Sequence, residues 1–180
     1  MKKIRYLIIA LLCAVAQGAW AQTTNVSNEA ALRYAIENGA NITLTQDITI
    51  SNAITVGNGQ TVTINLGGFT LKRGCTSRGS QGIGVYSGGT LYLSNGTVTG
   101  GWGGGGGGMF NEGTMHLTNV TITGNTADDR AGGISNNGTL TMTGCTVSNN
   151  TSRDAVDPAG GGGIFNYSGK TATLTNCTIT

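Results

Sequence analysis

Residues 89–100 read GTLYLSNGTVTG, and the same pattern returns three more times along the chain. The later copies are GTMHLTNVTITG at 113–124, GTLTMTGCTVSN at 138–149 and KTATLTNCTIT at 170–180. Their starts lie 24, 25 and 32 residues apart, and a glycine-led segment such as GGGMFNEG precedes each copy. Repeats of this period are typical of solenoids, in which each unit forms one coil of a stack.

Apolar residues occupy alternate positions within each copy, and Thr or Ser fills most of the positions between them. This alternation predicts short β-strands. The phase shifts by one residue in the middle of each copy, at Asn95, Asn119, Gly144 and Asn176. Asn and Gly tolerate a left-handed backbone, so each unit is predicted to be two strands joined by a one-residue bend. The predicted inward columns are Leu91/Met115/Leu140/Ala172, Leu93/Leu117/Met142/Leu174, Gly96/Val120/Cys145/Cys177 and Val98/Ile122/Val147/Ile179.

Parallel stacking of such units pairs every strand with its counterpart about 4.8 Å away in the next coil. The alternative is an antiparallel sandwich of hairpins. A sandwich would not require the same residues in the same order, and Asn-Gly turns would be expected between its strands. The sequence therefore favours an all-β fold, with a parallel β-solenoid over residues 41–180.

The units resemble those of right-handed parallel β-helix proteins of the pectate-lyase-like superfamily, and most closely the repeats of chlamydial polymorphic outer-membrane proteins and related bacterial surface passengers. Gly132-Gly133-Ile134 and Gly162-Gly163-Ile164 match the glycine-led motif of those repeats. Ile122-Thr-Gly-Asn125 and Val147-Ser-Asn-Asn150 match their F-x-x-N motif, with Ile or Val in place of Phe. The resemblance covers residues 82–180 well and 41–81 loosely, and it is to the broader repeat class. It implies a right-handed β-helix.

Residues 1–21, MKKIRYLIIALLCAVAQGAWA, combine a basic start, an apolar run from Leu7 to Ala16 and an Ala-Trp-Ala end. These features predict a secretory signal peptide that is cleaved after Ala21. The apolar run is too short for a transmembrane helix, and no second candidate follows it, so no membrane span is expected after cleavage. We therefore expect an exported protein, found at the cell surface or outer membrane or secreted.

Residues 22–40 are predicted to form a capping segment with a helix. Ser27 is the expected N-cap residue, Glu29 lies in the first turn, and Asn38-Gly39 ends the helix. A helix here would cover strand edges that the first coil leaves open. The sequence stops at Thr180 inside a predicted strand. We expect the C-terminal end of the β-helix to be incomplete and the chain to be the N-terminal part of a larger protein.

Three of the ten basic residues lie in the signal peptide, which leaves seven against eight acidic residues. This balance lacks the basic footprint of a nucleic-acid-binding protein. Cys75, Cys145 and Cys177 remain after cleavage. Cys145 and Cys177 share an inward column on adjacent coils, where the spacing permits a disulfide. Parallel side chains are not ideally aimed for that bond, and free thiols also fill such a column well, so both states stay open.

Enzymes of the pectate-lyase-like superfamily need converging carboxylates, with Ca²⁺ and a basic residue in lyases or an acid and base pair in hydrolases. Apart from Glu112, the acids of the repeat region lie in the loops TADDRAG and TSRDAVDPAG; they are Asp128, Asp129, Asp154 and Asp157. These loops occupy equivalent places in neighbouring coils, so a Ca²⁺ site is one interpretation. The spacing matches no calcium loop, and nearby arginines partly neutralise the acids, so solvated loops are favoured. No catalytic residue is assigned.

The run GGWGGGGGGMFNEG, residues 100–113, ends in the start of a regular strand. Its first part is predicted to be a loop of one coil, with Trp102 on the most flexible of three neighbouring loops. Tyr86, Phe110 and Phe165 are predicted to share one column, and outward-facing rings there could stack on sugars. His116, the only histidine, is expected on an exposed strand position level with Tyr92.

These features favour a non-catalytic scaffold on a bacterial surface, adhesin-like or structural, that contacts extracellular glycans or cell-surface proteins. One alternative is a polysaccharide lyase or hydrolase of the pectate-lyase-like kind. Another is a glycan-binding module that uses Trp102 and the aromatic column. No cofactor is expected other than Ca²⁺ under the metal-site interpretation.

Overall fold

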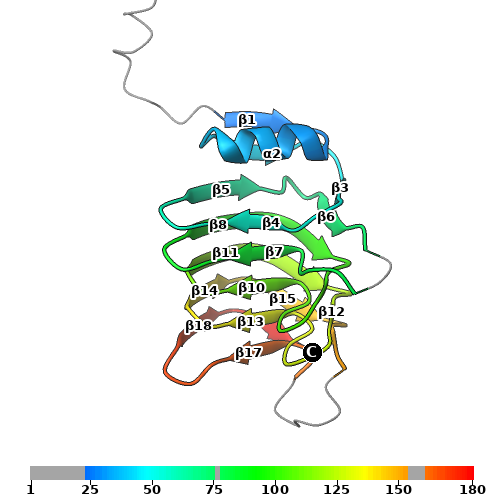
Figure 1. The fold of residues 1–180 in the computed structure, drawn as a ribbon, viewed down its shortest axis with the longest axis vertical. Helices are drawn as coiled ribbons and strands as arrows, with labels where there is room; N and C mark the ends of the chain where they lie inside the picture. Colours follow the sequence, from blue (N-terminus) through cyan, green and yellow to red (C-terminus); the bar gives the residue numbers. More distant parts are fainter. Residues whose placement is uncertain (1–22, 76–77, 154–160) are drawn as a thin grey trace, which may run out of the picture.

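The computed structural model describes residues 23–75, 78–153 and 161–180, so the predicted signal peptide lies outside it. The strands wind into stacked coils (Figure 1), and all pairs between the described strands are parallel. This confirms the predicted parallel β-solenoid. In the described part of the chain, the only helix is α2 (Glu29–Glu37), which precedes the coils.

Three sheets run along the stack. The first has eleven described strands: β1 (Thr23–Val26), β2 (Asn41–Leu44), β3 (Ile48–Ile50), β5 (Thr61–Asn65), β6 (Thr70–Arg73), β8 (Thr90–Thr99), β11 (Thr114–Thr123), β14 (Thr139–Thr143), β15 (Thr146–Ser148), β18 (Thr171–Thr175) and β19 (Thr178–Ile179). The second has five: β4 (Ile54–Val56), β7 (Ile83–Val85), β10 (Met109–Asn111), β13 (Ile134–Asn136) and β17 (Ile164–Asn166). The third has three short strands: β9 (Trp102–Gly103), β12 (Thr126–Ala127) and β16 (Thr151–Ser152).

The predicted one-residue bend is present in four successive coils. Asn95, Asn119 and Asn176 have φ values of 57°, 53° and 53°, and Gly144 has 63°. A left-handed residue turns the chain and moves the following side chains onto the opposite alternation. The apolar positions on both sides of the bend can therefore face the same core.

The core consists of apolar columns that continue from coil to coil. Leu91, Met115 and Leu140 are in register on three successive strands, and each is fully buried. Apolar burial of this kind contributes about 25 cal/mol per Å². Every coil contributes the same inward positions. A shift of one residue between neighbouring strands would expose the whole apolar set, so the register between coils is fixed.

An amide ladder along the second sheet accompanies the apolar core, and we did not predict it. Nδ2 of Asn111 donates to Oδ1 of Asn136 at 2.7 Å, and Nδ2 of Asn136 donates to Oδ1 of Asn166 at 2.6 Å. Nδ2 of Asn136 also donates to the Thr171 carbonyl at 3.0 Å. Asn111 and Asn136 are completely buried, so these bonds supply the partners that buried amides require.

The glycine run forms the predicted loop of one coil, level with the loop after Thr123, and it is packed between coils. Gly103, Gly106, Gly107 and Gly108 are buried. A Cβ on Gly107 would overlap the carbonyl oxygens of Thr126 and Gly132 and would lie 2.5 Å from the carbonyl carbon of Thr126. Only glycine lets neighbouring backbones approach this closely.

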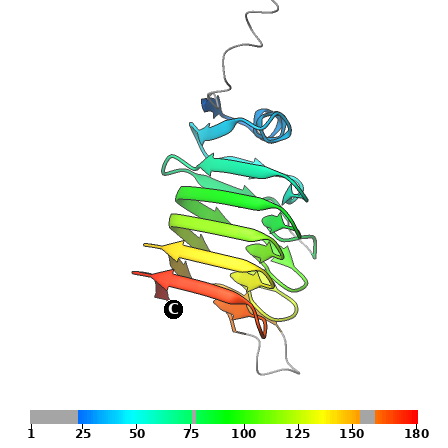
Figure 2. The ribbon, with the colours of Figure 1, turned by 90° about the vertical axis from the view of Figure 1, so that its left-hand side faces the viewer.

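Helix α2 lies at the N-terminal end of the stack (Figure 2). Its N-cap is Asn28, whose Oδ1 accepts from Ala31 N at 2.9 Å, so the prediction of Ser27 as the cap was wrong by one residue. Either side chain can cap a helix. The backbone of Asn28 is extended, and Ser27 follows strand β1, which we did not predict and which pairs with β2. The helix ends at Glu37 with Asn38 as its C-cap, as expected.

Glu29 ties α2 to the first coil. It accepts from Arg33 Nη2 at 2.8 Å, and from the backbone nitrogen and hydroxyl of Ser51 at 2.9 and 2.8 Å. Burial raises the pKa of Glu29, but the hydrogen bonds from Arg33 and Ser51 outweigh burial, and the pKa lies below its ordinary value. The ionised carboxylate therefore stabilises the capped state.

At the opposite end, β17, β18 and β19 form the last described coil (Figure 2). Leu174 and Ile179 are 41% and 43% exposed, whereas Leu93 and Val98, which occupy the same columns three coils earlier, are buried. The difference arises because no described coil covers the outer side of the last one.

Candidate functional site

The loops that leave the first sheet lie side by side, as the repeat predicts. Strand β12 pairs with β9 on one side and with β16 on the other, with Thr126 level with Trp102 and Thr151. Backbone hydrogen bonds continue beyond the strands, from Asp128 N to the Gly103 carbonyl at 3.1 Å and from Arg153 N to the Ala127 carbonyl at 2.8 Å. The side chains of successive loops therefore share one surface.

Trp102 is fixed on this surface by two contacts. Its indole Nε1 donates to Oδ1 of Asp128 at 3.1 Å, and the guanidinium carbon of Arg153 lies 4.3 Å from the centre of its ring. The ring is half-buried, with Arg153 over one face. A guanidinium over an indole is a favourable cation–π arrangement. Trp102 is therefore a support for Arg153 more than an open platform for a sugar ring.

Asp128 joins three loops. Besides the bond from Trp102, its Oδ2 lies 2.9 Å from Nε of Arg78, which belongs to the loop two coils earlier. The Asp128 side chain is 20% exposed and that of Arg78 is 78% exposed, so the carboxylate lies beneath the guanidinium. Asp129 forms an ion pair with Arg130 at 3.0 Å.

The four acids that we singled out for a metal site are thus of two kinds. Asp128 and Asp129 are bonded to arginine, and Asp154 and Asp157 lie outside the described residues. Across residues 23–75, 78–153 and 161–180, no three His, Cys, Asp or Glu side chains come together in a way that could hold a metal ion. The Ca²⁺ interpretation stays a prediction.

The aromatic column is confirmed for Phe110 and Phe165 but is wrong for Tyr86. Phe110 is in register with Ser135 and, on the other side, with Gly84. Tyr86 comes after β7 ends, and its ring turns back to within 6.3 Å of the Phe110 ring. A Cβ on Gly84 would lie 3.2 Å from a Tyr86 ring carbon, so glycine leaves room for the ring.

The column faces outward, because the residues on either side of Ser135 face the core and the amide ladder. Phe110, Phe165 and Tyr86 are half-buried or exposed, whereas Ser135 is completely buried. Its hydroxyl has no hydrogen-bond partner among the residues that the structure describes. Sequence reasoning left the direction of this column open, since three-residue strands are too short to show which alternate positions are inward.

Arg130 and Tyr167 are residues of this surface that we did not single out. The guanidinium carbon of Arg130 lies 5.7 Å from the centre of the Phe165 ring and 4.9 Å from that of Tyr167. The two rings meet edge to face, with centroids 5.0 Å apart. Their position in the repeat could have identified the arginines, because Arg130 and Arg153 stand in equivalent loops of neighbouring coils, next to predicted aromatic residues.

His116 lies on the outward face of the first sheet, apart from these loops. It is in register with Tyr92, and the two rings stack with centroids 4.7 Å apart and planes 10° apart. Its expected place is confirmed, although it is half-buried.

Cys75, Cys145 and Cys177 are free thiols in this structure. Burial raises the pKa of the Cys145 thiol, which donates to the Thr143 carbonyl at 3.4 Å. Cys177 makes the equivalent contact with the Thr175 carbonyl at 3.4 Å. Both thiols thus fill the inward column in the same orientation.

A pocket beside α2 is lined by Arg33, Ile36, Glu37, Ile54, Thr55 and Gln60. Arg33 is engaged there with Glu29 and with the carbonyls of Asn52 and Ala53, so its role is to hold the helix on the coil. Where the structure describes the chain, it contains no helix with the length and apolar character of a membrane span.

One family model matches this chain, described as the right-handed β-helix region, and it covers residues 35–180. No curated protein and no solved structure matches it. The matched range begins within α2 and includes every coil of the described solenoid. From the repeat, the parallel register and this match, we conclude that the chain belongs to the right-handed β-helix family.

Proposed function

We propose that the chain is an exported bacterial surface protein whose β-helix acts as a non-catalytic, adhesin-like scaffold. The main support for this proposal is the set of side-chain contacts that Asp128 makes. Its carboxylate accepts from Trp102 and pairs with Arg78, so it links loops of three successive coils into one surface. This arrangement supports a structural role, because a general acid or base needs a carboxyl group that can exchange its proton with a substrate.

The signal-peptide pattern of residues 1–21 and the resemblance of the repeats to bacterial surface passengers support export. A stack of coils is a rigid rod, and its regular loops offer an extended binding surface. The scaffold role is therefore consistent with both the predicted signal peptide and the surface formed by the loops of successive coils.

Export is tested by expressing the complete chain in a Gram-negative host, followed by cell fractionation and mass spectrometry of the N-terminus. The expected product begins at Gln22 and is found outside the cytoplasm. An intact N-terminus in the cytoplasmic fraction would contradict the proposal.

The non-catalytic role is tested by incubating the purified protein with acidic and neutral polysaccharides, with Ca²⁺ or with a chelator. We expect no unsaturated product and no new reducing ends. Cleavage that requires Ca²⁺ and is abolished in Asp154→Ala or Asp128→Asn would establish the lyase alternative instead.

A further inference from the structure

Arg73 is the only charged residue that is buried in the described part of the chain. It is the last residue of β6, and 7% of its surface is exposed. Among the described residues it makes no ion pair, whereas Arg33, Arg78 and Arg130 each pair with a carboxylate. Arginine is almost never buried without a partner, because an uncompensated charge is costly to remove from water. The charge of Arg73 therefore needs a compensating group.

The hydrogen-bond donors of Arg73 are also largely unused. A guanidinium carries N–H donors on all three of its nitrogens. Nη1 donates to the Ile50 carbonyl at 3.4 Å, which is long for a hydrogen bond, and the buried Nε has no partner among the described residues. An acceptor that also carries negative charge would satisfy the donors and the charge together.

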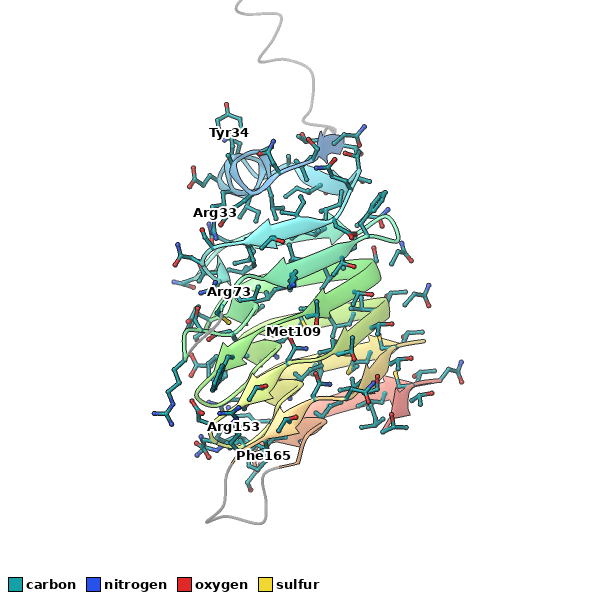
Figure 3. All side chains as sticks on the ribbon, turned by 90° about the vertical axis from the view of Figure 1, so that its right-hand side faces the viewer. Arg33, Tyr34, Arg73, Met109, Arg153 and Phe165 are labelled. Carbon is teal, nitrogen blue, oxygen red and sulfur yellow. The ribbon has the colours of Figure 1, made fainter. Side chains whose placement is uncertain are left out.

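The turn beside Arg73 offers few acceptors. In the first coil the chain passes from β3 directly to β4, without a strand of the third sheet. The carbonyls of Asn52 and Ala53 in this turn accept from Arg33, and Ile50 supplies the carbonyl that Arg73 reaches. Figure 3 shows Arg33 and Arg73 on the same side of the stack, with Arg33 nearer the capped end.

The nearest groups along the chain do not compensate Arg73 either. Lys72 comes directly before it, and its exposed side chain adds a second positive charge. The Cys75 thiol donates to the Gly100 carbonyl at 3.1 Å. A thiol that donates a hydrogen bond keeps its proton, so Cys75 brings no negative charge. The local excess of positive charge favours an anion from solution.

We propose that Arg73 binds a chloride-sized inorganic anion at the corner between the first and second coils. The ligand is small because Nε is enclosed by the protein and little of the residue is exposed. The donors of a guanidinium lie in one plane, so a single anion accepts from Nε and from a terminal nitrogen together. Only the folded chain holds the guanidinium in this enclosed place, so the anion stabilises the fold. The site is separate from the loop surface and does not depend on the scaffold role.

The test is thermal unfolding of the mature chain in sodium chloride and in sodium gluconate at equal ionic strength. Gluconate is the comparison because it is too large to reach an enclosed guanidinium. At about ten times its dissociation constant, chloride favours the folded state about elevenfold. For a chain of this size the expected rise in Tm is roughly 3–6 °C. In Arg73→Met the two salts are expected to give the same Tm, because no buried charge remains.

Lys72→Met is the matched control, since it removes the same charge from an exposed neighbouring position. It is expected to keep the full chloride effect, with folding of each variant verified by circular dichroism. In crystals of the parent chain grown with bromide, anomalous scattering is expected beside Nε of Arg73. The inference is overturned if the parent chain has the same Tm in both salts, if Arg73→Met keeps the difference, or if bromide does not occupy the site. These results leave the scaffold proposal unaffected, since it is tested by export and by the absence of polysaccharide cleavage.

Discussion

The glycine run provides the sharpest test of packing between coils, because two glycines three positions apart have opposite surroundings. In Gly107→Ala, the new methyl group would overlap the backbone oxygens of Thr126 and Gly132. Backbone atoms held in the neighbouring coil cannot move aside cheaply. In Gly104→Ala, the methyl group would enter open space, and the backbone there is not in the left-handed region.

Overpacking of this kind costs about 1–3 kcal/mol, and we expect Gly107→Ala to lie near the upper end because the methyl group would overlap backbone atoms rather than a flexible side chain. For a chain of this size, 1 kcal/mol corresponds to roughly 2–4 °C in Tm, so the expected loss is about 4–12 °C. Gly104→Ala restricts the unfolded chain and is expected to raise stability by about 0.4–1 kcal/mol.

The measurement is thermal unfolding followed by circular dichroism on both variants and the parent chain. If residues 100–108 were a flexible linker, the two substitutions would have the same small effect. Equal Tm values for the two variants, or a larger loss in Gly104→Ala, would refute the packing of this run between coils.

Three further predictions concern polar groups that the structure engages in hydrogen bonds or burial. Asn136→Ala removes the middle of the amide ladder and leaves buried partners unsatisfied, so urea denaturation should show a loss of about 2–4 kcal/mol, against less than about 1 kcal/mol for Asn137→Ala; equal losses would contradict the ladder. Glu29→Gln should cost about 1–2 kcal/mol at pH 7. Because the folded pKa of Glu29 is lowered, this difference should disappear as the pH falls below about 4.5, and a loss that is unchanged at pH 3 would disprove the ionised tie. Cys145 is buried and its pKa is raised, so it should be alkylated in the native protein more slowly than Cys75. Mass spectrometry of the labelled peptides measures both rates, and faster alkylation of Cys145 would contradict its burial.

The repeat made the fold predictable because the same physical requirement recurs in each coil. Asn95 and Asn119 could be recognised as bend residues only because Gly144 and Asn176 stand in the same alignment position. A single bend in a single strand would have no such support. The third sheet was missed because strands of two residues show no alternation, and their order comes from backbone pairing with the neighbouring coils.

The candidate site was less predictable, because its contacts join loops that the sequence separates by about one coil. The repeat correctly placed the loops beside each other. It did not predict that Asp128 would link Arg78 to Trp102, or that Arg153 would cover the indole ring. Side chains at the ends of irregular loops are oriented by local contacts, which no periodic pattern encodes. Tyr86 shows the same limit. Gly84 is the residue level with Phe110, so Tyr86 lies two positions beyond the column predicted for it.

The register between coils is tested most directly by the contact between Tyr92 and His116. His116 is the only histidine in the chain, so its ring protons can be identified without site-specific labelling. The stacked rings, with centroids 4.7 Å apart, predict nuclear Overhauser effects between the ring protons of Tyr92 and His116. They also predict a ring-current shift of the His116 signals that disappears in Tyr92→Leu. Both observations together would establish in-register parallel stacking at a spacing of one coil. A folded protein that shows neither would contradict it.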